Sequence, residues 1–324
     1  MEVWQYINHN LHNSNKIILL WVLESEGSSP GRRGFKMAVS ANGGFDGTIG
    51  GGMMEHKLVE KAKTLLASDE TEISLMRQYH DKQHSKDQSG MICSGSQLIA
   101  FVPISINEKK IIEGVVKSLE NEKKELVFLS PAGIKIIEDD SLMPVLKYST
   151  DKDWQYAEYI DQRPVIHIIG GGHVSLALSE LMSYLGFYIK LYDNRPDLNT
   201  IAHNTFANEK IIVDYNKIGD VINDNPDEYV AIMTFGYRDD KIVFGKLMDK
   251  RFLYIGMIGS EAKIKTLFKE FEEEGIDPDR WRHVFIPIGL NIFSKTAKEI
   301  AVSVAAEIIR EKNKYLPTGR SFSV

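Results

Sequence analysis

The apolar positions in the first half of the chain predict a mixture of strands and helices. Residues 17–25, IILLWVLES, form a continuous apolar run typical of a buried strand, and residues 35–40, FKMAVS, predict a second strand. The segment ANGGFD, residues 41–46, predicts a hairpin turn. Further apolar patterns predict helices at 53–66 and 108–122, a strand at 97–104 and a hairpin at 125–139. We therefore expect an N-terminal α+β domain over residues 1–150.

In the second half, short apolar strands alternate with helical segments. The strands are expected at 164–170, 188–193, 210–214, 229–235 and 252–259. Helices are expected to begin near His173, Lys217, Asp239 and Glu261, and a long one at 295–316. This alternation predicts a Rossmann-like, doubly wound parallel sheet over residues 163–324, an α/β fold. The polar residues at about 148–162 lack a clear strand pattern, and we expect them to form the linker.

Composition narrows the classes of protein and partner. The 324 residues carry a formal net charge of -6, with basic and acidic side chains interspersed, which argues against binding to nucleic acid or to an anionic membrane. A single cysteine allows no internal disulfide framework and suits a reducing compartment. The N-terminal residues show neither a signal sequence nor a membrane span, so we expect a cytoplasmic protein.

A glycine loop marks the start of the predicted Rossmann domain. Gly170, Gly171 and Gly172 follow an apolar strand and precede a helix, where backbone N–H groups and the helix dipole favour a phosphate. Asp193 ends the next strand, at the position where an acidic side chain accepts from a ribose hydroxyl. Ser175 takes the third place of the G-x-G-x-x-G pattern and is small enough for the helix to pack. The loop predicts binding of NAD(P) or of another phosphate-bearing molecule.

Other candidate residues lie at helix starts of the same domain. His173 at the start of its helix is expected to be neutral, and it either hydrogen-bonds a ligand or packs against the protein. Gly259 and Ser260 follow another predicted strand, where Ser260 is either a helix N-cap or part of the ligand site. Asp239 and Asp240 are ordinary acids of a first helical turn or, less simply, catalytic groups.

The first domain has a glycine loop of its own, GTIGGGMME at residues 47–55. Gly50, Gly51 and Gly52 are able to present N–H groups to an anion, with the Thr48 hydroxyl beside them. Glu55 lies in the first turn of the helix that follows, where the dipole stabilises a carboxylate. The preceding loop supplies basic side chains, namely Arg32, Arg33 and Lys36. Anion-binding elements in both halves suggest a large phosphate-bearing ligand between the domains.

Cys93 is the remaining candidate for metal or sulfur chemistry. Between Gly90 and Gly95 it is either a small buried side chain or a loop ligand for a metal or sulfur atom. His80 and His84 have helical spacing, but their segment is typical of a solvated loop. No Ser-His-Asp or zinc-protease motif is present in the sequence.

Together these stretches resemble the XdhC/CoxI family, accessory factors of xanthine dehydrogenase and related molybdenum hydroxylases. The matching stretches lie in the expected order at 27–39, 47–62, 168–195, 254–264 and 286–309. The resemblance implies a two-domain homodimer that binds the molybdenum cofactor, assists its sulfuration with a cysteine desulfurase, and inserts it into apo-xanthine dehydrogenase. We expect no turnover of its own from such a maturation factor. By analogy, residues 47–55 belong to the cradle for the cofactor's pterin or phosphate.

The sequence also differs from the family pattern. Cys93 is followed by Ser94 and Gly95, where two glycines are expected, and Phe235 stands where many members are expected to carry histidine. Two other hypotheses stay open. One is an NAD(P)-dependent oxidoreductase that uses the Rossmann loop, and the other is a Rossmann domain that binds no ligand and serves as an interaction surface.

Overall fold

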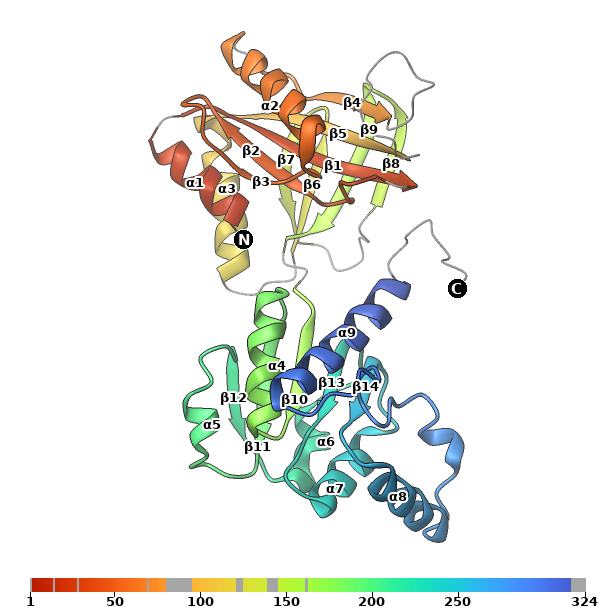
Figure 1. The fold of residues 1–324 in the computed structure, drawn as a ribbon. Coiled ribbons are helices and arrows are strands. Elements are labelled where there is room, and N and C mark those ends of the chain that lie inside the picture. Colours follow the sequence, from red (N-terminus) through yellow and green to blue (C-terminus); the bar gives the residue numbers. More distant parts are fainter. Residues whose placement is uncertain are drawn as a thin grey trace. The chain divides into compact units, whose positions relative to one another are not determined.

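The computed structural model describes residues 2–13, 15–27, 29–68, 70–79, 95–120, 125–138, 145–160 and 163–315. They form two compact units, which divide between residues 162 and 163 (Figure 1). None of the helices in these stretches combines the length and apolar character needed to cross a bilayer.

The described residues of the first unit form two antiparallel sheets. One has the strand order β3-β2-β1-β5-β4, and the other has the order β7-β6-β9-β8. The strands are β1 (Ile17–Gly27), β2 (Lys36–Ser40), β3 (Phe45–Gly47), β4 (Ser74–Tyr79), β5 (Gly95–Ile104), β6 (Leu126–Ser130), β7 (Gly133–Ile137), β8 (Val145–Thr150) and β9 (Asp153–Tyr159). The helical elements are α1 (Glu2–His12), α2 (Gly52–Ala67), η1 (Ile106–Glu108) and α3 (Lys109–Glu120).

Strand β1 is apolar through most of its length because both of its faces are buried. Leu19 and Trp21 pack in the cluster that includes residues of α1, α3, β6 and β9. Ile18 and Leu20 point to the other face and pack with side chains of α2, such as Leu58. Since successive side chains of a strand alternate between faces, two separate cores explain the apolar run of β1.

The expected linker is wrong for residues 153–159, which form strand β9 with a buried face. Trp154 and Tyr156 are almost fully buried, and Glu158 joins the two sheets through an ion pair with Lys36 of β2. The Trp21 indole N–H donates to the same carboxylate at 3.3 Å. The polar residues of this segment concealed the strand in the sequence, because some of them serve a buried hydrogen-bond network rather than solvent.

The second unit is a parallel sheet with the strand order β12-β11-β10-β13-β14. Its strands are β10 (Val165–Ile169), β11 (Tyr188–Asp193), β12 (Glu209–Ile212), β13 (Asn225–Ile232) and β14 (Phe252–Met257). Its helical elements are α4 (His173–Tyr184), α5 (Asn199–Ala202), η2 (Tyr215–Lys217), α6 (Ile218–Val221), α7 (Tyr237–Leu247), α8 (Glu261–Glu273), η3 (Pro278–Arg280) and α9 (Ala297–Tyr315). Numbered within the unit, this order is 3-2-1-4-5, that of a Rossmann fold.

Helices cover both faces of this parallel sheet (Figure 1). Side chains of α4 and α9, such as Leu178 and Val304, pack on one face. Those of α7 and α8, such as Phe244 and Leu267, pack on the other. The structure therefore confirms the predicted fold class, an antiparallel α+β portion followed by a Rossmann-like one.

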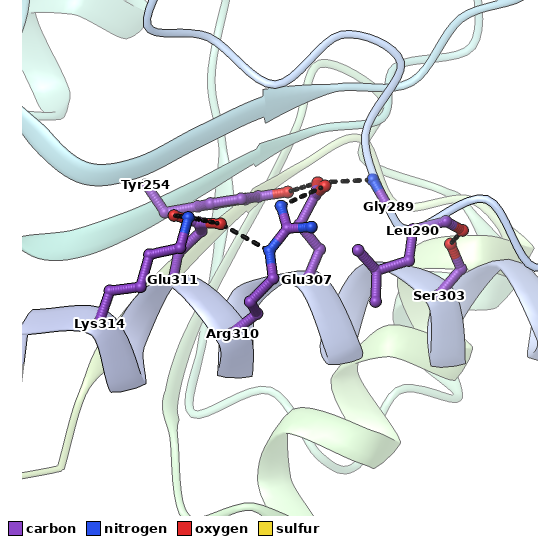
Figure 2. Close-up of polar contacts among 8 residues, drawn as sticks. All are labelled: Tyr254, Gly289, Leu290, Ser303, Glu307, Arg310, Glu311 and Lys314. Carbon is purple, nitrogen blue, oxygen red and sulfur yellow. Dashed lines mark hydrogen bonds and ion pairs between the residues drawn. The ribbon is translucent and has the colours of Figure 1, made fainter. Parts of the chain in front are cut away.

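Helix α9 is fastened to the sheet by a buried carboxylate. Glu307 is 5% exposed and accepts hydrogen bonds from the Tyr254 hydroxyl of β14 and from the Gly289 N–H, each at 2.8 Å (Figure 2). Arg310 donates to Glu307 at 3.3 Å and to Glu311 at 2.8 Å. Because a buried charge is tolerated only when it is paired and hydrogen-bonded, this network fixes where α9 lies.

Candidate functional site

The loop after β10 has three glycines with three different environments. A Cβ atom on Gly170, whose φ is +104°, would lie 2.2 Å from the carbonyl oxygen of Met233. On Gly171 it would lie 2.4 Å from Ile201 Cγ1, whereas on Gly172 it would meet nothing within 4 Å. The first two glycines are therefore required by packing, and the third leaves open space at the start of α4.

Asp193, at the end of β11, is held by the loop and by a neighbouring arginine. Its Oδ2 accepts from the Gly171 N–H at 2.6 Å and from Arg195 Nη2 at 2.8 Å. Its Oδ1 accepts from Arg195 Nε at 2.8 Å and from the Arg195 N–H at 2.9 Å. Burial alone would raise the pKa of Asp193, but the hydrogen bonds from Arg195 and Gly171 outweigh it and lower this pKa.

This geometry changes what Asp193 offers to a ligand. The side chain is 0% exposed, and both of its oxygens accept hydrogen bonds from the protein itself. A ribose hydroxyl would have to displace Arg195 to reach the carboxylate. The expected role of Asp193 as a ribose acceptor stays a prediction, while its structural role is to connect the ends of β10 and β11.

Two helices begin without a side-chain cap at the carboxyl ends of β10 and β13. Gly172 precedes α4 and Gly236 precedes α7, and neither helix start receives a side-chain hydrogen bond. Strands β10 and β13 are neighbours, and strand order reverses between them, where open α/β sheets bind their ligands. His173, the first residue of α4, is exposed there. These helix starts provide N–H groups and a positive dipole end suited to a phosphate.

A buried carboxylate lies at the neighbouring strand ends. Asp240 is 3% exposed, accepts from the Thr234 hydroxyl at 2.6 Å, and receives Lys263 Nζ of α8 at 3.2 Å. Burial raises the pKa of Asp240, against the hydrogen bond from Thr234 and the charge of Lys263. The cluster links α7 and α8 to the end of β13.

The second glycine-bearing strand end has a structural explanation. Ser260 accepts a hydrogen bond from the Lys263 N–H at 3.4 Å and is the N-cap of α8. A Cβ on Gly259 would lie 3.2 Å from Ile264 Cγ1, so this glycine allows α8 to pack closely. Neither position needs a ligand to account for it.

In the first unit, the chain's own carboxylate occupies the predicted anion cradle. Gly50, Gly51 and Gly52 have φ of +128°, +76° and +70°, a region of backbone space that L side chains rarely adopt. Glu55 Oε2 accepts from the Thr48 hydroxyl at 2.6 Å and from the N–H groups of Ile49 and Gly51 at 2.9 and 3.0 Å. The glycine run is thus explained by three successive residues of positive φ wrapped around Glu55.

The basic side chains upstream of this loop are divided between different tasks. Lys36 belongs to the buried pair with Glu158, and the Arg33 guanidinium lies over the Tyr156 ring at 5.2 Å from its centroid. Arg32 is exposed. The Gly31 backbone approaches so closely that a Cβ there would lie 2.3 Å from the Ile49 carbonyl oxygen, so this loop and the glycine run are packed together.

Cys93 lies outside the described residues, as do His80, Asp81, His84 and Asp87. Across the described ranges, no three histidine, cysteine, aspartate or glutamate side chains come together as a metal site. The prediction of a metal or sulfur role for Cys93 therefore stays a prediction.

Sequence reasoning missed Arg195 and Phe235 as partners. The Arg195 guanidinium carbon lies 5.6 Å from the centroid of the Phe235 ring, and Phe235 is 87% exposed. An arginine two residues after the strand-ending acid was the available signal, because that spacing lets a side chain fold back on its own strand end. The position of Phe235 required the order of the strands.

With this geometry in view, comparison with known families is informative. The model described as "XdhC and CoxI family" matches residues 11–80, and the model described as "XdhC Rossmann domain" matches residues 166–308. The chain belongs to the XdhC and CoxI family. One match falls in the first unit and the other covers the parallel sheet of the second.

Individual proteins agree with this family assignment. The chain is 26% identical over 298 residues to the uncharacterized protein YqeB of Escherichia coli (strain K12), covering 90% of this chain but 43% of that protein. It is 23% identical over 326 residues to a probable xanthine dehydrogenase component of Bacillus subtilis (strain 168), covering 94% of this chain and 96% of that one.

A solved structure agrees in fold. The crystal structure of a xanthine dehydrogenase from Bacillus halodurans matches with a TM-score of 0.73 and 22% identity, over 100% of this chain and 99% of that chain. At this identity the comparison shows a shared fold, which includes both units.

Proposed function

We propose that this protein is an accessory factor for a molybdenum hydroxylase of the xanthine dehydrogenase type. In this role it binds the molybdenum cofactor as cargo, supports its sulfuration by a cysteine desulfurase, and delivers it to the apo-hydroxylase as a homodimer without turnover of its own. The observation that carries the proposal is the match of two XdhC family models, one in each unit. The relatives named for xanthine dehydrogenase support the same partner class.

The geometry favours the Rossmann loop over the first glycine loop as the contact for the cofactor's phosphate. The start of α4 has no side-chain cap and has open space at Gly172, so an incoming anion meets N–H groups rather than a carboxylate. At Gly51, by contrast, Glu55 already accepts from the N–H group. A phosphate there would have to displace a negative charge of the protein itself.

The test is a binding titration of the purified protein with molybdenum cofactor released from a molybdoenzyme, with NAD and NADP run in parallel. We expect saturable binding of the molybdenum cofactor. Gly172→Asp should weaken it by about tenfold or more, because one added charge against a bound phosphate costs on the order of 1–2 kcal/mol near a helix end. The fold should be retained, since aspartate is a favoured N-cap residue.

A matched variant controls for added charge. Gly43→Asp places the same carboxylate in the β2–β3 turn, where a Cβ meets nothing within 4 Å, and should leave the affinity unchanged. Failure of the natural protein to bind the cofactor, with NAD or NADP binding instead, would contradict the proposed function. Equal affinity of folded Gly172→Asp and the natural protein would contradict only the location of the phosphate.

A second measurement addresses the delivery step. Cofactor-loaded protein mixed with apo-xanthine dehydrogenase should restore hydroxylase activity faster than free cofactor at the same concentration. Gly172→Asp should reduce this advantage, and Gly43→Asp should not.

A further inference from the structure

An exposed aromatic ring lies at the carboxyl edge of the parallel sheet, where open α/β folds bind ligands. Phe235 follows β13 and is 87% exposed. A large apolar side chain gains nothing from this degree of exposure, since burying it would be favourable by roughly 1.5–3 kcal/mol. Its position next to the uncapped start of α7 at Gly236 makes it a surface on which a flat ring can stack.

The ring has a fixed cationic neighbour. The Arg195 guanidinium is held by paired hydrogen bonds to both Asp193 oxygens, each at 2.8 Å, and lies over Phe235. Asp193 in turn accepts from the Gly171 N–H. One continuous series of contacts therefore runs from the Rossmann loop through the carboxylate and the guanidinium to the exposed ring.

A buried hydroxyl without a partner points to a ligand at the same edge. Tyr215, shortly after β12, is 2% exposed, and its hydroxyl makes no hydrogen bond of good geometry in the structure. Asp193, Arg195 and Asp239 all lie near enough to act electrostatically on this phenol. Leaving such a group unsatisfied costs about 1–3 kcal/mol, so a polar atom of a ligand or an ordered water is needed to complete the site.

The charges at this edge decide where a phosphate would lie. Asp239, in the first turn of α7, places a carboxylate beside that helix start. Asp240 is paired with Lys263, and Asp193 is paired with Arg195. The first turn of α4 carries no acidic residue, so a phosphate is favoured at Gly172 and His173 rather than at α7.

We propose that this edge binds a nucleotide, with its base stacked on Phe235 beside Arg195 and its phosphates at the start of α4. The inference deepens the proposed function and rests on it in one respect. If the cargo is a dinucleotide form of the molybdenum cofactor, its nucleotide half occupies this site. A free nucleotide has the same chemistry, and the experiment separates the two sources.

The experiment is calorimetric titration of the full chain with ADP, CDP and pyrophosphate. Since stacking of one base on an aromatic side chain is equivalent to about tenfold or more in affinity, ADP or CDP should bind at least tenfold more tightly than pyrophosphate. Phe235→Ala should remove that difference and leave pyrophosphate unaffected, and Phe235→Trp should restore it. Tyr215→Phe should weaken nucleotide binding without loss of fold.

Tyr184→Ala is the matched control, because Tyr184 is 88% exposed at the opposite end of α4. Its nucleotide affinity should equal that of the natural protein. Equal binding of pyrophosphate and ADP, or full ADP affinity in Phe235→Ala, would overturn the inference.

Cofactor titrations with the same variants distinguish this failure from failure of the proposed function. Binding of the molybdenum cofactor without any nucleotide preference would overturn the nucleotide site and leave the proposed function standing. Nucleotide binding without cofactor binding would do the reverse. A loss of affinity in Phe235→Ala for the dinucleotide form alone, and not for the bare form, would identify the cargo as the nucleotide source.

Discussion

The Gly171 N–H donates to Asp193 Oδ2 at 2.6 Å, so the loop after β10 is held by the end of β11. Asp193→Asn keeps the shape of the side chain but removes its charge. Hydrogen bonds to charged groups contribute about 1.5–3 kcal/mol, so we expect the free energy of unfolding of the second unit to fall by about 2 kcal/mol at pH 7. Hydrogen exchange of the β10 and β11 amides measures this unit by itself.

The same variant gives a pH test. Because the pKa of Asp193 is lowered in the folded state, its stabilising contribution is complete above the unfolded-state pKa of about 4 and is lost as pH falls through the folded pKa. The difference between Asp193→Asn and the natural protein should therefore shrink on acidification below about pH 4. Asp197→Asn, at an exposed neighbour, should show no difference at any pH. A gap that widens in acid would contradict the assignment.

Glu55→Ala tests whether the first glycine loop depends on its internal carboxylate. The change removes the acceptor for Thr48, Ile49 and Gly51, and we expect a loss of about 1–2 kcal/mol in urea unfolding, similar to the loss of a helix cap. Glu60→Ala, on the exposed face of the same helix, should change stability by less than about 0.5 kcal/mol. Equal effects of the two variants would show that the loop is held by backbone contacts alone.

Gly170→Ala and Gly172→Ala separate packing from ligand contact within one loop. At Gly170 the new methyl group collides with the Met233 carbonyl, and we expect a loss of about 3 kcal/mol or more in urea unfolding. At Gly172, with φ of -74° and open space, alanine should be neutral or stabilise by up to about 1 kcal/mol. Similar losses at both positions would mean that the start of α4 is closed.

Asp240→Asn has an effect of the opposite sign with pH. Burial, the largest influence, raises the pKa of Asp240 in the folded state, so the natural protein loses stability as pH rises through the unfolded-state pKa of about 4. Asparagine keeps an acceptor for Thr234 and removes this loss. We expect a gain of up to about 1 kcal/mol that develops between about pH 3 and pH 6 in urea unfolding. A gain that is largest at the acid end of this range would contradict the sign of the shift.

Phe293→Asn should stabilise the second unit. Phe293 is 85% exposed and has a φ of +58°, a conformation that costs an ordinary L residue about 1–2 kcal/mol and that asparagine tolerates. We expect the free energy of unfolding to rise by about 0.5–1 kcal/mol. Tyr184→Asn replaces a similarly exposed aromatic residue in α4 and should give no gain. A loss at Phe293→Asn would show that the ring makes contacts that offset its strained backbone.

Much of the fold follows from the sequence because apolar runs and their flanking turn residues are local signals. Residues 17–25 and 165–169 predicted buried strands, and the alternation after residue 162 predicted a parallel sheet. Strand β9 was missed because Glu158 and Tyr156 are polar side chains that are buried by pairing with each other and, for Glu158, with Lys36. No window of sequence contains the partner that makes such a residue a core residue.

The candidate site was predictable in its backbone but not in its contacts. The glycine patterns located Gly170 to Gly172 and the run of positive φ at Gly50 to Gly52. The sequence did not reveal that Glu55 fills its own loop, because a first-turn acid has an ordinary explanation in the helix dipole. Nor did it pair Arg195 with Phe235, which follow different strands.

The buried carboxylate of Glu307 also has a consequence in time. Tyr254 and Gly289 both donate to it, yet they precede it in the chain and leave the ribosome first. Until Glu307 emerges, this hydroxyl and this backbone N–H lack their acceptor, and the face of the sheet that α9 covers is bare. Because domains fold as units during synthesis, the second unit closes only when α9 arrives, well after residues 1–162 have been made.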